Sequence, residues 1–264
     1  MRSEFSRAFV LFAAALLAAC AAVVPPRDST ATLALAPTGK LRVAVYPGSP
    51  TSLVRDPDGQ TRGVALDLGR AMAGGLGVPF EMAEFRNNAE ALEAVKEGRA
   101  DFAFTNATPA RMKDMDFSPA LMGVEQGYIV PAGSSIRSVA DVDRAGVRVG
   151  VSKASSSERE LTTLLKAATL VPAPTLAAGR QMLAEGKIEA YATNKAILKE
   201  MSAALPGSRI LDGRYGLESF AIGVPRGREA GHGWLRSFAE RARSDGTVDK
   251  AIDRAGLRGA ASQP

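Results

Sequence analysis

The sequence predicts an α/β protein made of two similar lobes, and the main observation behind this prediction is an internal repeat. Ten residues, EGRADFAFTN at 97–106, return 88 positions later as EGKIEAYATN at 185–194. Each copy follows a helix-like stretch (89–96 and 177–184), and the Gly of its Glu-Gly pair fits a helix C-terminal stop. The apolar run in each copy indicates a short buried strand that ends on Thr-Asn. Strands and helices alternate through the rest of the chain, which is typical of the α/β class.

The repeat also predicts where a ligand binds. Ligands of open α/β sheets sit beyond the carboxyl ends of the strands. Two units with those ends facing each other form a cleft, with Asn106 and Asn194 at its two sides. Two ordinary helix-Gly-strand joints can also resemble each other by chance, so the repeat alone leaves both interpretations open.

The hydrophobic pattern of the first half predicts one long helix and three strands outside the repeat. Gly77 ends the helix, so the Gly-Gly-Leu-Gly run at 74–77 closes a helix instead of opening one, which excludes a dinucleotide-binding fingerprint. Thr-Pro-Ala-Arg at 108–111 predicts a helix start, with Thr as N-cap and Pro at the first helical position. The helix covers residues 64–76 and the strands cover 41–46, 79–84 and 122–130.

The second half continues the alternation. A strand at 148–151 leads to Ser155 and Glu158, which have the spacing of a capping box. Leu161, Leu164, Leu165 and Ala168 then mark one face of the helix that follows. Residues 219–224 form a strand, and residues 229–255 are helical.

The N-terminus predicts export and a lipid anchor. Arg2 and Arg7 precede an apolar stretch at 8–19 that is too short for a membrane span and fits a secretory signal peptide, residues 1–19. The signal closes on Leu-Ala-Ala-Cys at 17–20, which resembles the lipobox of bacterial lipoproteins, a family in which cleavage before the Cys is coupled to its lipidation. We therefore expect Cys20 to carry lipid, although a lone Cys in a signal core can also be incidental. Cys20 is the only cysteine, which excludes an intramolecular disulfide and metal sites built on several thiols.

Composition narrows the function of the remaining chain. Residues 20–38, rich in Ala, Pro and Thr, are expected to be a flexible tether behind the lipidated Cys. Removing residues 1–19 takes away two of the 33 basic and one of the 28 acidic residues and leaves a net charge of +4. The basic residues are dispersed among acids, so we expect no nucleic-acid partner. No later segment reaches 18 uninterrupted apolar residues, so the mature body is expected to be soluble.

Seven short motifs in a fixed order point to a known family. From residue 39 to about 256 the chain resembles the extracellular solute-binding proteins of polar amino-acid ABC transporters, family 3, which have the periplasmic-binding-protein-like type 2 fold. No one motif is specific, but their order and spacing cover nearly the whole mature chain. They are Gly-Lys-Leu-Arg-Val at 39–43, Gly63 with Asp-Leu at 67–68, Gly-Arg-Ala-Asp at 98–101, Thr-Pro-Ala-Arg at 108–111, Asp-Phe-Ser at 116–118, Gly-Lys-Ile-Glu-Ala at 186–190 and Asp-Gly-Thr at 245–247.

The resemblance implies two lobes joined by two hinge strands, near 123–130 and 219–224. Lobe one then holds residues 39–125 plus 220–258, and lobe two holds residues 126–219. A ligand that touches both lobes favours the closed form by its differential affinity. In this family a membrane permease reads the closed form. We expect a monomer without a cofactor.

The resemblance also implies binding residues. In the family an Arg at the position of Arg111 grips the α-carboxylate of the ligand, a task that suits its planar fork. Thr108 either caps the helix or also offers its hydroxyl to the ligand. Ser155 and Ser156 lie in the family's anion-binding turn at a helix N-terminus. Asn106 and Asn194 either face each other across the cleft or only cap helices, and Tyr46, Phe85 and Phe104 either line the pocket or belong to the core.

Several positions depart from the family. Where this chain has Asn194, the family usually has an Asp that holds the ammonium of the ligand, so recognition of an ordinary α-amino acid is in question. The loop at 50–53 lacks the family's aromatic residue, and the stretch from 101 to 111 is two residues shorter than usual. We therefore expect a small carboxylate-bearing solute, an amino acid or an analogue.

Catalysis has little support in the sequence. His232 is the only histidine and lies in the C-terminal helical part, which argues against a Ser-His or Cys-His arrangement at the cleft. Clusters with metal-ligand spacing are absent from the sequence pattern. Some proteins of this fold are cyclohexadienyl dehydratases that use cleft carboxylates as acid or base, so such an enzyme is the alternative. A receptor that signals to a partner protein is a third possibility.

Overall fold

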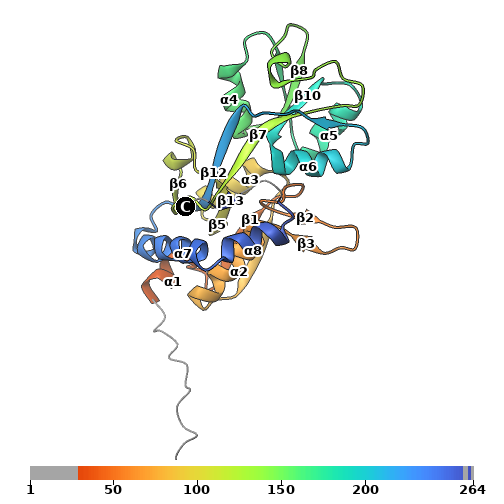
Figure 1. The fold of residues 1–264 in the computed structure, drawn as a ribbon. Coiled ribbons are helices and arrows are strands. Elements are labelled where there is room, and N and C mark those ends of the chain that lie inside the picture. Colours follow the sequence, from red (N-terminus) through yellow and green to blue (C-terminus); the bar gives the residue numbers. More distant parts are fainter. Residues whose placement is uncertain (1–28, 258–260, 263–264) are drawn as a thin grey trace, which may run out of the picture.

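Two lobes lie one above the other in the structure, joined by two long strands (Figure 1). The computed structural model describes residues 29–257 and 261–262 of the 264-residue chain. The predicted signal peptide, the predicted lipidation site Cys20 and residues 21–28 lie outside the described residues. Lobe one contains both ends of the described chain, whereas lobe two is made from its middle. In this described part, none of the helices has the length and apolar character needed to cross a membrane.

A single path of hydrogen-bonded strands runs through both lobes, in the order β4-β1-β5-β12-β7-β10-β8-β9. The two long strands at its centre, β7 (Met122–Val130) and β12 (Gly216–Pro225), pair antiparallel with each other. β12 continues into lobe one beside β5, and β7 continues into lobe two beside β10. Both strands therefore cross the boundary between the lobes, at the places where the sequence predicts hinge strands.

Lobe one is a parallel sheet covered by helices. Its three parallel strands are β4 (Phe80–Glu84), β1 (Leu41–Val45) and β5 (Phe102–Asn106). The remaining elements are the helices α1 (Ser29–Leu35), α2 (Val64–Leu76), α3 (Asn88–Lys96), α7 (His232–Ser244) and α8 (Thr247–Arg254), the single turns η1 (Arg111–Lys113) and η3 (Glu229–Gly231), and the short strands β2 (Val54–Arg55), β3 (Thr61–Arg62), β6 (Met115–Phe117) and β13 (Ala261–Ser262).

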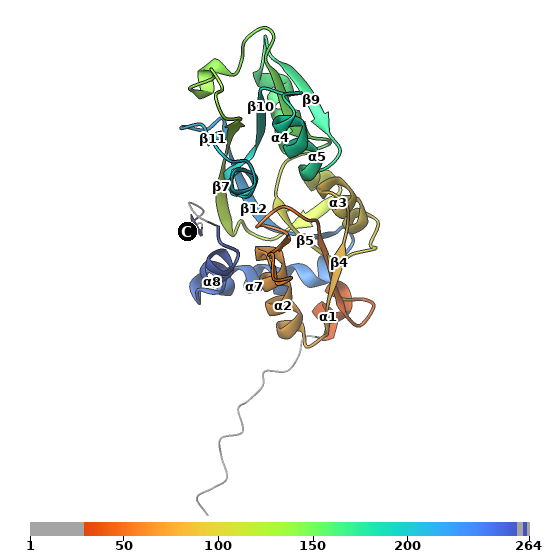
Figure 2. The same ribbon diagram turned by 90° about the vertical axis from the view of Figure 1, so that its right-hand side faces the viewer.

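Lobe two repeats this arrangement on a smaller scale. Its parallel strands are β10 (Ala190–Asn194), β8 (Arg148–Ser152) and β9 (Thr169–Ala173). Its other elements are the helices α4 (Ser156–Leu164), α5 (Leu176–Ala184) and α6 (Lys195–Ala203), the turn η2 (Val139–Asp141) and the strand β11 (Arg209–Ile210). Figure 2 shows β4 and β9 at the outer side of their respective lobes.

Each lobe has its own hydrophobic core. In lobe one, side chains of α2, such as Leu68 and Met72, pack with Phe102 of β5 and with residues of α7 and α8. In lobe two, Val149 and Leu161 belong to a cluster on one side of the sheet and Tyr191 to a second cluster. Two cores connected mainly by β7 and β12 are the architecture that a hinged two-lobed protein needs.

The predicted repeat is a true structural repeat. Gly98 and Gly186 follow α3 and α5 in the left-handed conformation, with φ of 71° and 66°, which is why both copies carry Gly there. The next elements, β5 and β10, both end on the Asn of the Thr-Asn pair. Because strand order reads outward from β12 in lobe one and from β7 in lobe two, Asn106 and Asn194 arrive at the cleft from opposite sides.

Most predicted elements are confirmed, but three local predictions are wrong. The segment at 29–35 is not a flexible tether: it forms α1, and its Ala31 and Leu35 are fully buried in lobe one. The helix predicted from Thr108 is only the single turn η1, although the backbone N–H of Arg111 does donate to Thr108 Oγ1 at 3.3 Å. η1 is followed directly by β6, which leaves no room for more helical turns.

The third correction concerns α4. The Ser155 hydroxyl accepts from the Glu158 backbone N–H at 3.1 Å, as predicted, but the Glu158 carboxylate accepts from the N–H of Ala154 and not of Ser155. The capping box is therefore only half formed. Of the predicted apolar face, Leu164 is 48% exposed and ends the helix, whereas Leu165 and Ala168 lie beyond the helix and pack, partly buried, against the lobe-two core.

The two lobes touch each other across the cleft in this structure. Asn87, at the start of α3, donates from its side chain to the carbonyl of Pro174 before α5, at 3.3 Å. Arg62 of lobe one pairs with Glu200 of α6, at 3.0 Å. These contacts describe a closed arrangement of the lobes.

Candidate functional site

A polar cavity of about 50 Å³ lies between the lobes, where the carboxyl ends of β5 and β10 meet. It brings together six of the nine residues that the sequence analysis considered for ligand binding. Lobe one contributes Tyr46, Asn106 and Arg111, and lobe two contributes Ser155, Ser156 and Asn194. The location agrees with the rule that ligands of α/β sheets sit beyond the strand ends.

Arg111 lies at the lobe-one side of the cavity and is only 7% exposed. One terminal nitrogen donates to the Thr105 hydroxyl at 2.7 Å and to the Asn106 carbonyl at 3.1 Å. Its Nε is buried and has no hydrogen-bond partner. Burial lowers the pKa of Arg111 to about 10, so the guanidinium remains charged at neutral pH. A buried guanidinium with an unused donor is suited to bind an anion.

Glu218, on β12, is the negative counterpart that the sequence analysis missed. Its side chain lines the same cavity, and the residue is only 6% exposed. Its Oε1 accepts hydrogen bonds from Asn106 at 2.9 Å, from Ser156 at 2.5 Å and from Gln126 at 3.4 Å, and its Oε2 accepts one from Asn194 at 3.0 Å. Burial raises the pKa of Glu218, while the hydrogen bonds and the charge of Arg111 act in the opposite direction.

The two repeat asparagines meet at this carboxylate. Asn106 of lobe one and Asn194 of lobe two each donate a side-chain N–H to Glu218, one to each oxygen. Asn194 also accepts from the Ile197 backbone N–H at 3.1 Å and so caps α6, whereas Asn106 uses its backbone carbonyl to hold Arg111. Asn194 therefore lines the cleft and also caps a helix, so it does not only cap.

At the start of α4, Ser155 bonds to the helix and Ser156 bonds to a residue of the cavity. Ser155 caps α4, and Ser156 donates its hydroxyl to Glu218. A helix N-terminus favours nearby negative charge. In this structure that charge is the carboxylate of Glu218.

The last four candidate residues lie in different surroundings. Tyr46 lines the cavity, and burial raises its pKa. Thr108 lies outside the cavity, in a neighbouring hollow on the other side of Glu218, where it holds the backbone of Arg111. Of the two alternatives for the Phe residues, pocket wall or core, the structure favours the core, and Phe85 does not line the cavity: Phe104 is core, with its ring 5.5 Å from that of Phe220, and Phe85 packs against a hydrophobic cluster of lobe one beneath Arg99.

Glu218 escaped the sequence analysis for a definable reason. The predicted hinge strand began at Ser219, whereas β12 begins at Gly216, so Glu218 fell just outside it. An acidic residue beside an apolar hinge strand is the signal that points to it, since a buried sheet tolerates a charge only where partners are provided.

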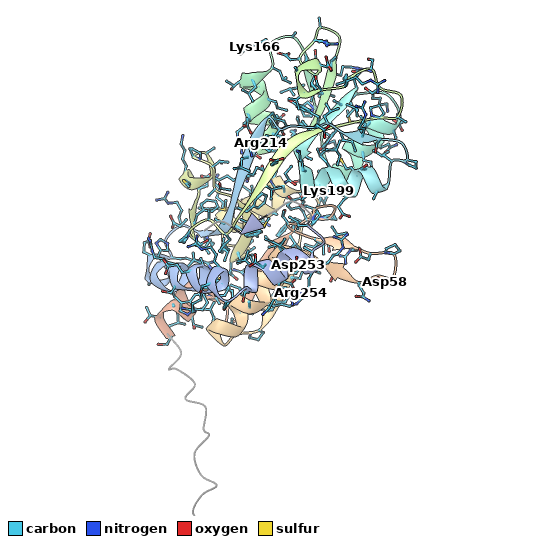
Figure 3. The ribbon with its side chains drawn as sticks, viewed as in Figure 1. Asp58, Lys166, Lys199, Arg214, Asp253 and Arg254 are labelled. Carbon is cyan, nitrogen blue, oxygen red and sulfur yellow. The ribbon has the colours of Figure 1, made fainter. Side chains whose placement is uncertain are left out.

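The described residues give little support for a metal site or for histidine-based catalysis in the cavity. They contain no group of three or more His, Cys, Asp or Glu side chains placed to hold a metal ion. His232 lies 3.3 Å from Asp116, a pair within lobe one that does not line the cavity. Charged side chains such as Asp58, Lys166 and Asp253 are spread over separate parts of both lobes (Figure 3).

Comparison with known proteins identifies the family. Residues 41–256 match the family model of the bacterial extracellular solute-binding proteins, family 3. The chain belongs to this family. This membership confirms the resemblance drawn from the seven motifs, and the two-lobed α/β fold agrees with the solved structures it resembles.

Relatives match over nearly their full length. The ABC transporter glutamine-binding protein GlnH of Bacillus subtilis is 25% identical, over 95% of this chain and 96% of its own. The amino-acid ABC transporter substrate-binding protein AbpA of Streptococcus pneumoniae, solved with L-arginine, is 26% identical with a TM-score of 0.75, covering 84% of this chain and 96% of its own. A solute receptor for L-cysteine from Neisseria gonorrhoeae has the same fold, with a TM-score of 0.76 at 22% identity over 86% and 93% of the two chains.

One relative is an enzyme by name. The membrane-bound lytic murein transglycosylase F of Maricaulis maris is 33% identical over 138 residues. That match covers 50% of this chain but only 30% of the transglycosylase. The shared part is therefore one segment of a longer protein.

Proposed function

We propose that this protein is the substrate-binding component of an ABC importer and captures a small amino acid or related carboxylate by closure of its lobes. The observation that carries the proposal is the buried Arg111, whose Nε lacks a partner beside a cavity lined by both lobes. A guanidinium in this position binds a carboxylate through charge-assisted hydrogen bonds. The relatives that are named for glutamine and arginine support an amino acid as ligand.

The positions of the proposed ligand-binding residues support closure of the lobes around a ligand. Arg111 belongs to lobe one, and Ser155 and Asn194 belong to lobe two, so a ligand in the cavity adds contacts that only the closed form supplies. Such a ligand stabilises the closed form by its differential affinity. The membrane permease of the importer is the partner that recognises this form, and the protein acts as a monomer without its own catalysis.

A thermal-shift screen tests this proposal. The chain from residue 21 onwards is heated with each of the 20 protein L-amino acids, and with small keto acids and amines as comparison compounds. A ligand at 100 times its Kd adds about 2.7 kcal/mol to the free energy of unfolding, which moves the melting temperature by a readily measured amount. Stabilisation by one or a few amino acids supports the proposal, and a response to none of them contradicts it.

We also propose that Cys20 carries lipid and holds the protein at the periplasmic side of the cell envelope. The support is the Leu-Ala-Ala-Cys run at 17–20, in which the predicted cleavage falls directly before Cys20. Cys20→Ser is expected to stop maturation at this site and to remove lipid from the protein. Mass spectrometry of the membrane-bound protein decides the matter, because an intact and unmodified Cys20 would contradict the assignment.

A second candidate function rests on Glu218. A buried carboxyl whose pKa is raised by burial is suited to donate a proton, which is the role that cleft carboxylates play in cyclohexadienyl dehydratases of this fold. Incubation with prephenate or arogenate separates the two candidates. Turnover that Glu218→Gln abolishes would favour the enzyme, and binding of amino acids without turnover favours the importer component.

A further inference from the structure

We propose that Glu218 binds the ammonium group of the ligand, and that the ligand is therefore a zwitterionic α-amino acid held between Glu218 and Arg111. This inference rests on the proposed function and names the ligand class for the same site. It assigns the cation-binding role to the strand β12, between the lobes, and not to position 194 at the end of β10.

The first argument is the set of partners around Glu218. All four side chains that donate hydrogen bonds to its carboxylate are neutral: Asn106, Gln126, Ser156 and Asn194. Among the described residues, no cation is hydrogen-bonded to this buried carboxylate: Arg111 and Arg159 act on it only through space, and a carboxylate without a directly paired cation is costly to bury. The site is therefore completed by a cation from outside the protein.

The second argument is the separation of the two charges. Asn106 lies between them, since its backbone carbonyl accepts from Arg111 while its side chain donates to Glu218. Within the described residues, no ion pair joins Arg111 to Glu218, although both line one cavity. Asn106 holds the two charges apart, so each is left to bind the opposite charge of a ligand.

The third argument is hydrogen-bond capacity. A carboxylate offers about four acceptor positions. Oε1 of Glu218 accepts from three side chains, whereas Oε2 accepts from Asn194 alone. Oε2 is therefore the oxygen with room for an ammonium N–H, just as Nε of Arg111 is the donor with room for a carboxylate oxygen.

The fourth argument concerns Asn194 itself. Its side-chain oxygen caps α6 through Ile197, and its nitrogen donates to Glu218. Both ends of the amide are thus engaged within the protein. Asn194 is a positioning residue for Glu218, which explains how the site can recognise an ammonium although position 194 carries no charge.

Matched ligands and matched variants test the inference by calorimetry on the chain from residue 21 onwards. Each L-amino acid that binds is compared with its α-hydroxy acid, which keeps the carboxylate and side chain but replaces the ammonium with a hydroxyl. We expect the wild-type protein to bind the α-hydroxy acid about 100-fold more weakly. Glu218→Gln, which keeps the shape of the side chain, is expected to weaken binding of the amino acid by about 100-fold and binding of the α-hydroxy acid by less than about threefold.

Glu240→Gln is the matched control, because it removes an exposed carboxylate of α7 that does not line the cavity. We expect it to change the affinity for the amino acid by less than about threefold. An amino-acid affinity that Glu218→Gln leaves unchanged would overturn the inference and leave the proposed function intact. Failure of all 20 amino acids to bind the wild-type protein would overturn both.

If Glu218→Gln does not fold, the wild-type protein and Glu218→Asp decide the question. Equal affinity for an amino acid and its α-hydroxy acid would overturn the inference, and so would tighter binding of the α-hydroxy acid. A preference of about 100-fold for the amino acid, lost in Glu218→Asp because its shorter side chain withdraws the charge, supports it.

Discussion

The two lobes contain the same hydrogen-bonded frame in two different environments. In lobe one, Arg42 donates from its backbone and side chain to Asp101 and from its side chain to the Gly98 carbonyl. In lobe two, Arg148 makes the same four bonds to Glu189 and the Gly186 carbonyl. The Asp101 side chain is fully buried and also pairs with Arg228, whereas the Glu189 side chain is 36% exposed. One local sequence pattern therefore fixes the geometry of the hydrogen bonds in both lobes, while burial decides how much those bonds contribute to the free energy of unfolding.

The same comparison applies at the cleft. Asn106 and Asn194 end equivalent strands and both reach Glu218, yet lobe one adds the cation Arg111 and lobe two adds the N-terminus of α4. The repeat therefore supplies a symmetric scaffold for an asymmetric ligand. In the proposed site, one lobe presents a donor for a carboxylate, and both lobes orient the acceptor for an ammonium.

The largest expected effect is on the stability of the two frames. Asp101→Asn leaves Arg42 and Arg228 without a buried counter-ion, which is expected to lower the free energy of unfolding by about 3–5 kcal/mol. The matched change Glu189→Gln removes an exposed partner and is expected to cost less than about 1 kcal/mol. Urea denaturation of both variants measures the difference, and equal losses would show that burial does not separate the frames.

The next effect concerns the lobe-one cation. Arg111→Ala is expected to weaken amino-acid binding by roughly 2–5 kcal/mol, because it removes one partner of a charge pair buried on closure. Arg180→Ala, at an exposed position of α5, is the control and should leave the affinity unchanged. Calorimetry that finds the wild-type affinity in Arg111→Ala would remove this residue from the site.

The next prediction adds a charge to the site, at Asn194 of lobe two, instead of removing one. Asn194→Asp restores the charge that relatives usually carry, but it places a second carboxylate 3.0 Å from Glu218 in place of a donor. Two carboxylates sharing a site raise the pKa of one of them, so the pair takes up a proton. We expect weaker binding of the amino acid, by tenfold or more. Tighter binding would place the ammonium at position 194 and not at Glu218.

Much of this architecture was predictable because single residues fix local geometry. Gly77 ends α2 with φ of 70°, as expected, and Gly98 and Gly186 end the repeat helices. By contrast, α1 was missed because residues 29–35 carry little amphipathic pattern, and its place depends on distant contacts such as the Arg228 bond to the Leu35 carbonyl at 3.0 Å. Local sequence signals identify individual helices and strands. Burial that depends on contacts with distant parts of the chain leaves no local signal in the sequence.

The site shows the same division. Arg111, Ser156 and the two asparagines were identified from the motifs and the repeat, and the cavity brings them together. Glu218 was not, because it follows the strand Met122–Val130 by almost 90 residues and reaches the cavity only through pairing of β12 with β7. Tertiary structure sets the register between strands that are distant in sequence, and the spacing of residues along the chain does not predict that register.

The smallest effect is a pH dependence. The groups around Glu218 are the neutral Asn106, Gln126, Ser156 and Asn194 and the charged Arg111, Arg159 and Glu160. Burial raises the pKa of Glu218 from its usual 4.5, and ammonium binding requires its ionised form. Affinity is therefore expected to be constant above that raised pKa and to fall, by about tenfold per pH unit at the limit, once the pH drops below it. Titration calorimetry checks this, and an affinity that falls equally in Glu218→Gln would assign the effect to another group.

The central claim is that an amino acid closes the lobes by joining lobe one to lobe two. Cys20 is the only cysteine, so the chain from residue 21 onwards accepts spin labels at Glu93→Cys on α3 and Arg180→Cys on α5, exposed positions on opposite lobes. Double electron–electron resonance then reports the distance between the labels, without ligand and with a saturating amino acid from the thermal-shift screen. The account predicts that the amino acid shifts the population to the shorter distance of the closed lobes. A distance distribution that the saturating amino acid leaves unchanged would contradict it.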